Sequence, residues 1–363
     1  MDPARDVVIV TGSSGLIGSA TAAVLSEHFA VVGFDRGGPP HPPPPVDCVS
    51  VDITSDDGVR QGMDHVRARY GSRIASVVHL AAYYDFSGAP SPQYDMVTVR
   101  GTERLLHALR GLTVEQFVFS STMLVHAPCE PGQRIAEDWP IDPRWPYPES
   151  KVKTERLIEA ERGPIPAVLL RIAGVYDDRC HSIPLSHQIQ RIYERSVTSH
   201  VFPGHLAHGQ SFLHLRDLVD GIVRLIDRRL VLPPVLPLLV GESDAVSYDE
   251  LQHTLGRLIH REEWDTREIP KALARAGAWV QDSIPGVEDP FIKPWMIDFA
   301  DDHYALDLTR ARTLLEWEPR RSLRDTLPKM VEALKADPVE WYREHKLSAP
   351  RSGQEPSPEI KNR

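Results

Sequence analysis

Tyr147 and Lys151 are the residues whose types and spacing indicate chemistry most directly. They stand four residues apart, with Pro148 between them at the first position of a predicted helix. Residues at this spacing share one helical face, so the phenol and the ammonium can reach the same point. A nearby cation and a helix N-terminus both lower a tyrosine pKa from about 10 toward the range of a general base. The same spacing occurs at ordinary amphipathic helix starts, so other parts of the chain must distinguish the two interpretations.

Lysine is scarce in the part of the chain that holds this pair. Lys151 and Lys153 are the only lysines among the first 270 residues, although arginine is abundant there. An ammonium is a compact charge with an adjustable pKa, which a guanidinium does not replace. The presence of a lysine at position 151 therefore favours a chemical role for this residue.

A glycine-rich turn near the N-terminus predicts a dinucleotide-binding unit. Residues 6–11 form a short apolar run of the kind found in buried parallel strands. Gly12, Gly15 and Gly18 follow and open a helix that reaches about residue 28. Glycines at this spacing allow a tight turn and a close backbone approach. The free N–H groups of the helix start can bind a pyrophosphate.

The acid after the second strand predicts which dinucleotide is bound. Residues 30–34 form that strand, and Asp35 follows it about 20 residues after the glycines. A carboxylate there accepts hydrogen bonds from a ribose diol and repels a 2′-phosphate, which favours NAD over NADP. Arg36 favours NADP instead, because an arginine can pair with a 2′-phosphate.

Strands and helices continue to alternate along the first half of the chain, as in a doubly wound α/β sheet. Predicted strands cover residues 46–51, 74–80, 114–119 and 167–171, and predicted helices cover 55–70, 91–109 and the segment that starts at 147. Ligands bind at the carboxyl ends of such strands. Leu80, Ala81 and Ala82 end one strand, and the small alanines let a cofactor lie close.

Polar and aromatic residues after these strands are further candidates. Asp52 and Ile53 could border an adenine ring, although an acid at a strand end is equally often a helix cap. Tyr83 and Tyr84 form an aromatic rim that could contact a substrate or pack on its own domain.

The second half of the chain predicts a smaller lobe. Predicted helices cover residues 184–195, 217–229, 247–260, 308–316 and 322–336, and predicted strands cover 211–215 and 235–240. We expect a Rossmann-type doubly wound parallel sheet with a smaller C-terminal α/β substrate lobe. The expected domains are an NAD-binding domain over 1–171, a mainly substrate-binding lobe over 172–346 with segments returning to the sheet, and a disordered tail over 347–363. The proline-rich residues 37–45 predict a stiff surface loop.

Charge and composition exclude several classes of protein. The net charge is −10 and the pI about 5.9, which argues against nucleic acid or an anionic membrane as a partner. Three cysteines without C-x-x-C spacing indicate neither a disulfide framework nor a zinc site, and we expect no metal. No run of 18 apolar residues occurs, and the N-terminus does not resemble a signal peptide. We therefore expect a cytoplasmic protein.

Five motifs in order give the chain a resemblance to a known family. It resembles the extended short-chain dehydrogenase/reductases, and most of all their NAD-dependent epimerase/dehydratase branch, over roughly residues 6–330. The motifs are Thr11-Gly12-x-x-Gly15-x-x-Gly18, Asp35, His79-Leu80-Ala81-Ala82, Ser120-Ser121-Thr122 and Tyr147-x-x-x-Lys151. Two later segments, 170–176 and 211–217, are also similar to segments of this family.

The resemblance implies roles for these residues. Tyr147 would be the acid/base of a hydride transfer between a secondary alcohol and NAD, and Lys151 would hold the nicotinamide ribose and lower the phenol pKa. Thr122, rather than Ser121, would bond the reacting oxygen. The implied cofactor-binding residues are Gly12, Ser14, Gly15, Leu16, Ile17, Gly18, Asp35, Arg36, Asp52, Ile53, Leu80, Ala81, Ala82, Ser120, Tyr147 and Lys151. The implied substrate-binding residues are Tyr83, Tyr84, Thr122, Met123, Gly174 and Arg179. A homodimer packed through helices 91–109 and 148–162 is also implied.

Some positions depart from the pattern of the family. Thr98 replaces a usual asparagine, His126 a usual tyrosine, and Gln210 a frequent arginine, while Gly174 stands where nucleotide-sugar epimerases carry an asparagine. The last two weaken the assignment of a nucleotide sugar as substrate. A simple NAD(P)-dependent alcohol dehydrogenase or ketone reductase on a smaller or more apolar substrate is the alternative. A non-catalytic NAD-sensing protein would not need the tyrosine–lysine pair.

Overall fold

The computed structural model describes residues 5–37, 46–85, 88–275 and 293–348. These residues belong to two compact units. The first comprises Met1–Gly174, Gln210–Ala245 and His303–Ser322, and the second comprises Val175–Gly209, Val246–Asp302 and Leu323–Arg363. Most of the predicted proline-rich loop and of the predicted tail lie outside the described residues.

The first unit is built on a seven-stranded sheet in which every neighbouring pair of strands is parallel. The strand order is β13 (Val235–Val240), β8 (Ala167–Ile172), β7 (Phe117–Thr122), β5 (Ser76–His79), β1 (Val7–Thr11), β2 (Ala30–Asp35) and β3 (Asp47–Ser50). The central strands are almost entirely buried and mostly apolar because helices cover both of their faces. The predicted Rossmann-type α/β fold class is confirmed.

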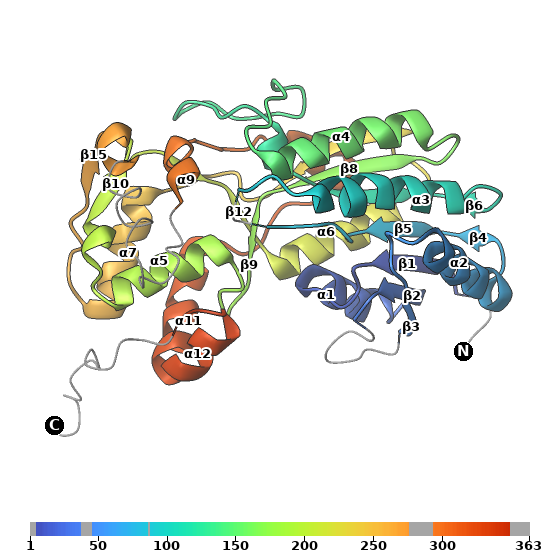
Figure 1. Cartoon of the computed structure of the whole chain (residues 1–363), viewed down its shortest axis with the longest axis horizontal. Coiled ribbons are helices and arrows are strands. Elements are labelled where there is room, and N and C mark those ends of the chain that lie inside the picture. Colours follow the sequence, from blue (N-terminus) through green and yellow to red (C-terminus); the bar gives the residue numbers. More distant parts are fainter. Residues whose placement is uncertain (1–4, 38–45, 86–87, 276–292, 349–363) are drawn as a thin grey trace. The chain divides into compact units, whose positions relative to one another are not determined.

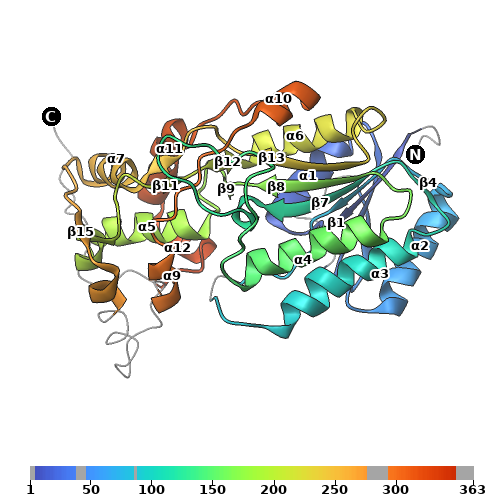
Figure 2. The ribbon, with the colours of Figure 1, turned by 90° about the horizontal axis from the view of Figure 1, so that it is seen from above.

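Helices lie on both faces of this sheet (Figures 1 and 2). One face carries α2 (Asp56–Tyr70), α3 (Arg100–Ala108) and α4 (Pro146–Glu161), and the other carries α1 (Leu16–Leu25), α6 (Leu215–Asp227) and α10 (Thr309–Leu315). Ile9, Phe34, Met63, Leu105 and Ile158 belong to the buried core between the first face and its helices.

The direction of chain connection reverses between β1 and β5, which lie side by side. Thr11, the last residue of β1, is paired with His79, the last residue of β5. In open α/β sheets such a reversal opens a crevice at the carboxyl ends of the strands. The glycine turn and residues 80–82 therefore meet at one point of the sheet edge.

Three predicted elements of this unit differ in detail. The helix expected over 91–109 contains the π-helix η1 (Tyr94–Val99) and continues as α3. The strand expected over 74–80 is divided into β4 (Arg73–Ile74) and β5, and the strand expected over 114–119 is divided into β6 (Thr113–Val114), which pairs with β4, and β7. The short 3₁₀ helix η2 (Met123–Val125) follows β7 directly. Apolar periodicity does not separate a π-turn from an α-turn, and it does not show where one extended run divides.

The second unit is mostly helical. It contains α5 (Ile183–Tyr193), α7 (Tyr248–His260), α9 (Pro294–Asp298), α11 (Leu323–Ala336), α12 (Pro338–Glu344), the 3₁₀ helix η3 (Val197–His200) and the parallel pair β10 (Val201–Pro203) and β15 (Arg267–Ile269). It also contains β14 (Val246–Ser247), while β9 (Gly174–Tyr176) and β11 (Gly209–Gln210) each include one residue of the first unit, and β12 (Phe212–His214) belongs to the first unit. Among the described helices, none combines the length and apolar character that a membrane crossing requires.

Candidate active site

The glycine turn has the close packing that its sequence predicts. Gly12 has a φ of +70°, and a Cβ placed there would lie 3.0 Å from the backbone nitrogen of Ala81. A Cβ on Gly18 would lie 2.0 Å from the carbonyl oxygen of Gly12, so only glycine fits. The helix α1 begins directly after Gly15. Its first N–H groups have no partner among the helical carbonyls, and groups of this kind can bind a pyrophosphate.

Asp35 lies at the carboxyl end of β2 with its carboxylate fixed by the backbone. Its Oδ2 accepts a hydrogen bond from the Ser14 N–H and its Oδ1 accepts one from the Gly37 N–H, each at 3.0 Å. Each carboxylate oxygen can accept a second hydrogen bond. The geometry therefore leaves Asp35 able to bind a ribose diol.

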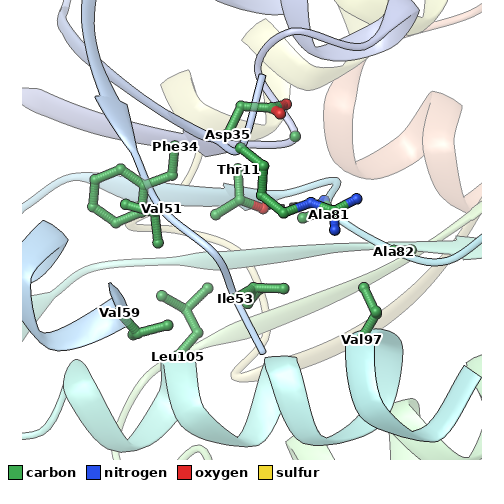
Figure 3. Close-up of a pocket in the computed structure, with 12 residues that line it drawn as sticks. Thr11, Phe34, Asp35, Val51, Ile53, Val59, Ala81, Ala82, Val97 and Leu105 are labelled. Atoms are coloured by element: carbon green, nitrogen blue, oxygen red, sulfur yellow. Dashed lines mark hydrogen bonds between the residues drawn. The ribbon is translucent and has the colours of Figure 1, made fainter. Parts of the chain in front are cut away.

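A pocket opens beside Asp35, as Figure 3 shows. Asp35 and Thr11 lie at one end of it, and Val59 and Leu105 lie at the other. The lining residues are Thr11, Gly12, Phe34, Asp35, Arg36, Val51, Ile53, Val59, Ala81, Ala82, Val97 and Leu105. An apolar slot with a carboxylate at its mouth fits a flat base joined to a ribose.

Six of these lining residues were predicted from the sequence and six were not. Gly12, Asp35, Arg36, Ile53, Ala81 and Ala82 were predicted, whereas Thr11, Phe34, Val51, Val59, Val97 and Leu105 were missed. Thr11, Phe34 and Val51 are each adjacent in the sequence to a predicted site residue. This adjacency could have identified them as lining residues. The other three lie on helices, where apolar periodicity does not separate a residue that lines a pocket from one that faces the core.

Asp52 forms a local turn. Its Oδ1 accepts hydrogen bonds from the Thr54 N–H at 2.9 Å and from the Thr54 hydroxyl at 2.8 Å. These bonds hold the pKa of Asp52 below its usual value, and the charges of Arg36 and Arg104 act in the same direction. Ser55, rather than Asp52, caps α2.

A buried relay through His79 positions the residues after β5. The Ala81 N–H donates to Thr11 Oγ1 at 3.1 Å, and Thr11 Oγ1 lies 2.7 Å from His79 Nδ1. His79 Nε2 lies 2.9 Å from Thr102 Oγ1, whose own hydroxyl donates to the Thr98 carbonyl at 2.6 Å. His79 must therefore donate from Nε2 and accept at Nδ1. Burial lowers the pKa of His79 to about 3, so the ring is neutral.

Lys151 is buried beneath the Tyr147 ring. Its ammonium donates to the carbonyl of Ser120, the fourth residue of β7, at 2.7 Å. It lies 4.9 Å from the ring centroid of Phe119 and 5.6 Å from that of Tyr147. Burial lowers the pKa of Lys151 to about 7, and the charge of Glu155 opposes this effect.

Tyr147 is hydrogen-bonded to Thr122, the residue at the end of β7. Burial raises the pKa of Tyr147 above its usual value, although this hydrogen bond acts to lower it. The nearby charge and the helix N-terminus predict a lowered phenol pKa from the sequence, whereas desolvation, which depends on packing, acts in the opposite direction and is the larger effect here. Ser121 does not compete for this position, because its hydroxyl donates to Glu155 at 2.5 Å.

Aromatic rings surround the Tyr147 phenol. The ring of Tyr84 packs edge-on against it with centroids 4.9 Å apart, and the ring of Trp145 lies 5.3 Å away. Tyr83 packs edge-on against Tyr94, and its backbone N–H donates to Thr98 Oγ1 at 3.0 Å. Tyr84 thus lies next to the phenol, and so does Trp145, which was not predicted from the sequence as a site residue.

The other predicted substrate residues lie in different surroundings. Met123 is buried at the start of η2. A Cβ on Gly174 would lie 3.0 Å from the Phe212 ring, so close packing accounts for this glycine. Arg179 belongs to the second unit, where its guanidinium pairs with Glu344 at 2.7 Å. Over the described part of the chain, no group of three or more His, Cys, Asp or Glu side chains could hold a metal ion.

Known proteins share features of this sequence and fold. The chain is 28% identical to a UDP-glucose 4-epimerase of Streptomyces lividans over 249 residues, which cover 61% of this chain and 71% of that protein. It is 24% identical to a 3 beta-hydroxysteroid dehydrogenase/Delta 5-->4-isomerase of Mycobacterium tuberculosis over 359 residues, which cover 89% of this chain and 90% of that protein.

A solved structure shares the fold. The UDP-glucuronic acid 4-epimerase of Bacillus cereus, in complex with UDP-glucuronic acid and NAD, superposes with a TM-score of 0.66 at 20% identity. The superposition covers 91% of this chain and 99% of that protein. The model of the NAD-dependent epimerase/dehydratase family matches residues 8–234. The chain therefore belongs to the NAD-dependent epimerase/dehydratase family and is an enzyme whose cofactor is NAD.

Proposed function

We propose that this enzyme transfers a hydride between a secondary alcohol and NAD, with Tyr147 as the acid/base. The observation that carries the proposal is that Thr122 hydrogen-bonds Tyr147 while Lys151 is buried beneath the same ring. A substrate oxygen placed between the hydroxyls of Tyr147 and Thr122 would be held by both. NAD, when bound, supplies the nicotinamide that accepts or returns the hydride.

Each residue of the site would have its own role in this reaction. Tyr147 accepts the proton of the substrate hydroxyl during oxidation and returns it to the oxygen during reduction. Thr122 orients that oxygen, and Lys151 supplies positive charge and binds the nicotinamide ribose. The glycine turn, Asp35 and the pocket beside it hold the rest of the dinucleotide.

We propose a nucleotide sugar as the substrate. The support is that relatives and structural neighbours carry names of enzymes that act on UDP- or dTDP-sugars. A net oxidation or reduction of a more apolar alcohol is the second candidate. The rings of Tyr84 and Trp145 around the phenol favour it, and so does the similarity to a steroid dehydrogenase along most of the chain.

Mass spectrometry of small molecules that co-purify with the protein separates the two substrates. A bound UDP-, GDP- or dTDP-sugar would support the first. Turnover of apolar secondary alcohols, followed as NADH formation and absent with UDP-glucose or UDP-glucuronic acid, would support the second.

Tyr147→Phe tests the catalytic role. We expect the kcat to fall by at least about 100-fold, because a positioned acid/base contributes about 10²–10⁴-fold. The Kd of NAD, measured by calorimetry, should change by less than about threefold because the phenyl ring remains. Tyr70→Phe, a change on the distant helix α2, is the matched control and should retain kcat. An unchanged kcat in Tyr147→Phe would refute the role of Tyr147.

A further inference from the structure

Glu155 and Arg171 form a buried ion pair close to the tyrosine–lysine pair. Glu155 lies one helical turn after Lys151 on α4, and Arg171 lies in β8. The guanidinium donates from Nη2 to Oε2 at 2.7 Å and from Nε to Oε1 at 3.1 Å. Both side chains are less than a tenth exposed, at 7% and 6%. Apolar residues of similar size often stabilise a fold as well as a buried ion pair does, so the pair calls for a functional explanation.

The other contacts of Arg171 fix this pair from the side of β8. Its Nη1 donates to the Glu137 carbonyl at 3.0 Å and to His126 Nε2 at 3.1 Å. Since His126 Nε2 accepts, its Nδ1 carries the proton and donates to the Trp139 carbonyl at 3.0 Å. Burial and the charge of Arg171 lower the pKa of His126 to about 4. The histidine is thus a neutral acceptor that helps to orient Arg171.

Glu155 also belongs to a set of bonds that join the end of β7 to α4. Three successive residues of the strand each bond a different residue of the helix. These bonds join Ser120 to Lys151, Ser121 to Glu155, and Thr122 to Tyr147. Loss of the Glu155 carboxylate would therefore weaken the bond from Ser121 and disturb the bonds of Ser120 and Thr122 on either side of it.

The charge of Glu155 acts on the ammonium of Lys151. Residues at i and i+4 share a helical face, and both of these side chains are buried. Burial lowers the pKa of Lys151, and Glu155 opposes that effect. The other ionisable groups that face Lys151 are Tyr147 on its own helix and the neutral His79 from β5. The groups that face Glu155 are Arg171 and His126.

We propose that Glu155 is a positioning residue for the Tyr147–Lys151 pair. Its carboxylate keeps Lys151 in the ammonium form and ties the end of β7 to α4, without touching substrate or cofactor itself. The inference rests on the proposed function, because that function gives Lys151 its task beside Tyr147.

The test is the pKa of Lys151 in the wild type and in Glu155→Gln. The whole chain contains eight lysines, so selective ¹³Cε-lysine labelling gives few NMR signals, and Lys151→Met assigns the relevant one. We expect the pKa of Lys151 to be lower in Glu155→Gln by about 1 pH unit, since a nearby opposite charge shifts a pKa by about 1–3. Glu159→Gln, on the exposed side of the same helix, is the matched control and should leave the titration unchanged. An unchanged titration in Glu155→Gln would overturn the proposal.

A second variant covers the case in which Glu155→Gln does not fold, because that change leaves Arg171 buried without a counter-charge. Glu155→Gln/Arg171→Gln removes both charges and should also lower the pKa of Lys151, because Glu155 is the group that acts on it. A pKa equal to that of the wild type in the double variant would likewise contradict the proposal.

Kinetics separate this inference from the proposed function. The pH profile of kcat for oxidation should shift to higher pH in Glu155→Gln, because less ammonium means a less acidic phenol, and it should not shift in Glu159→Gln. An unshifted profile would count against the proposal. If Tyr147→Phe retained turnover, the proposed function would fail, while the NMR titration of Lys151 would still report on Glu155.

Discussion

Asp35 is the residue whose geometry bears most directly on the choice between NAD and NADP. Backbone N–H groups of Ser14 and Gly37 hold its two oxygens at the mouth of the apolar pocket. A carboxylate fixed in this way can accept hydrogen bonds from a ribose diol and repels a 2′-phosphate. Arg36 lines the same pocket and would be free to pair with a phosphate once the acid is gone.

Asp35→Asn should therefore weaken NAD binding and reduce the difference in affinity between NAD and NADP. We expect the Kd of NAD to rise by about 10-fold or more, because a hydrogen bond to a charged group contributes about 1.5–3 kcal/mol. The Kd of NADP should fall. Calorimetric titration with each dinucleotide measures both values. Asp64→Asn, a change on the exposed side of α2, should alter neither, and equal losses for the two dinucleotides would show that Asp35 does not discriminate.

Candidate-site residues at the ends of strands were easier to predict from the sequence than those that line a cavity from a helix. Asp35, Ala81 and Thr122 could be found because the ends of parallel strands meet at one sheet edge. Val97 and Leu105 could not, since an apolar residue facing a pocket has the same periodicity as one facing the core. The raised phenol pKa of Tyr147 was also out of reach, because desolvation depends on packing that the sequence does not display.

Thr98 links two elements, the π-helix η1 and the segment after β5. Its hydroxyl accepts the Tyr83 N–H, and its carbonyl accepts the hydroxyl of Thr102, which continues the relay to His79. The adjacent Tyr84 packs on the ring of Tyr147. The bond at Thr98 thus connects a helix start to the aromatic rim of the candidate site. π-turns are frequent at functional sites, and this one lies beneath such a rim.

Thr98→Val tests this link, because valine keeps the shape of threonine and removes only the hydroxyl. The Tyr83 N–H would lose its acceptor, which should lower the free energy of unfolding by about 1–2 kcal/mol in urea titrations. Thr113→Val, at an exposed position of β6, is the control and should change stability by less than about 0.5 kcal/mol. Equal effects of the two variants would mean that the Thr98 hydroxyl does not anchor the segment.

Elements with strong periodicity were easier to predict than short ones. The buried strands β1, β2 and β8 and the helix α2 lie within a few residues of their expected bounds. The short helix α10 and the short strand β12 were also expected, over 308–316 and 211–215, whereas the helix α12 and the strand pair β10 and β15 were not, since short segments carry little apolar pattern. Tertiary contacts hold such elements; Tyr342 of α12, for example, donates to Glu194 at 2.9 Å.

Across the molecule, buried histidines bear on stability as a function of pH. Burial lowers the pKa of His79 to about 3, and those of His126 and His187 to about 4. In the unfolded chain a histidine pKa is about 6.5. As the pH falls below that value, these histidines bind protons in the unfolded state but stay neutral in the folded state. The stability that these three neutral histidines contribute is therefore fully present above about pH 6.5 and decreases as the pH falls toward 3–4.

His79→Gln isolates one of these contributions at the centre of the first unit. Between pH 8 and pH 5, a histidine with a folded pKa near 3 and an unfolded pKa near 6.5 removes about 2 kcal/mol of stability. The decrease in the free energy of unfolding between the two pH values, measured by urea titration, should be smaller in His79→Gln by about that amount. Any stability that the substitution itself removes at pH 8 cancels in this difference. His205→Gln, at a side chain 70% exposed, should leave the decrease as it is in the wild type. If all three proteins lose the same free energy between pH 8 and pH 5, His79 is not held neutral in the fold, and the proton positions assigned to its relay are wrong.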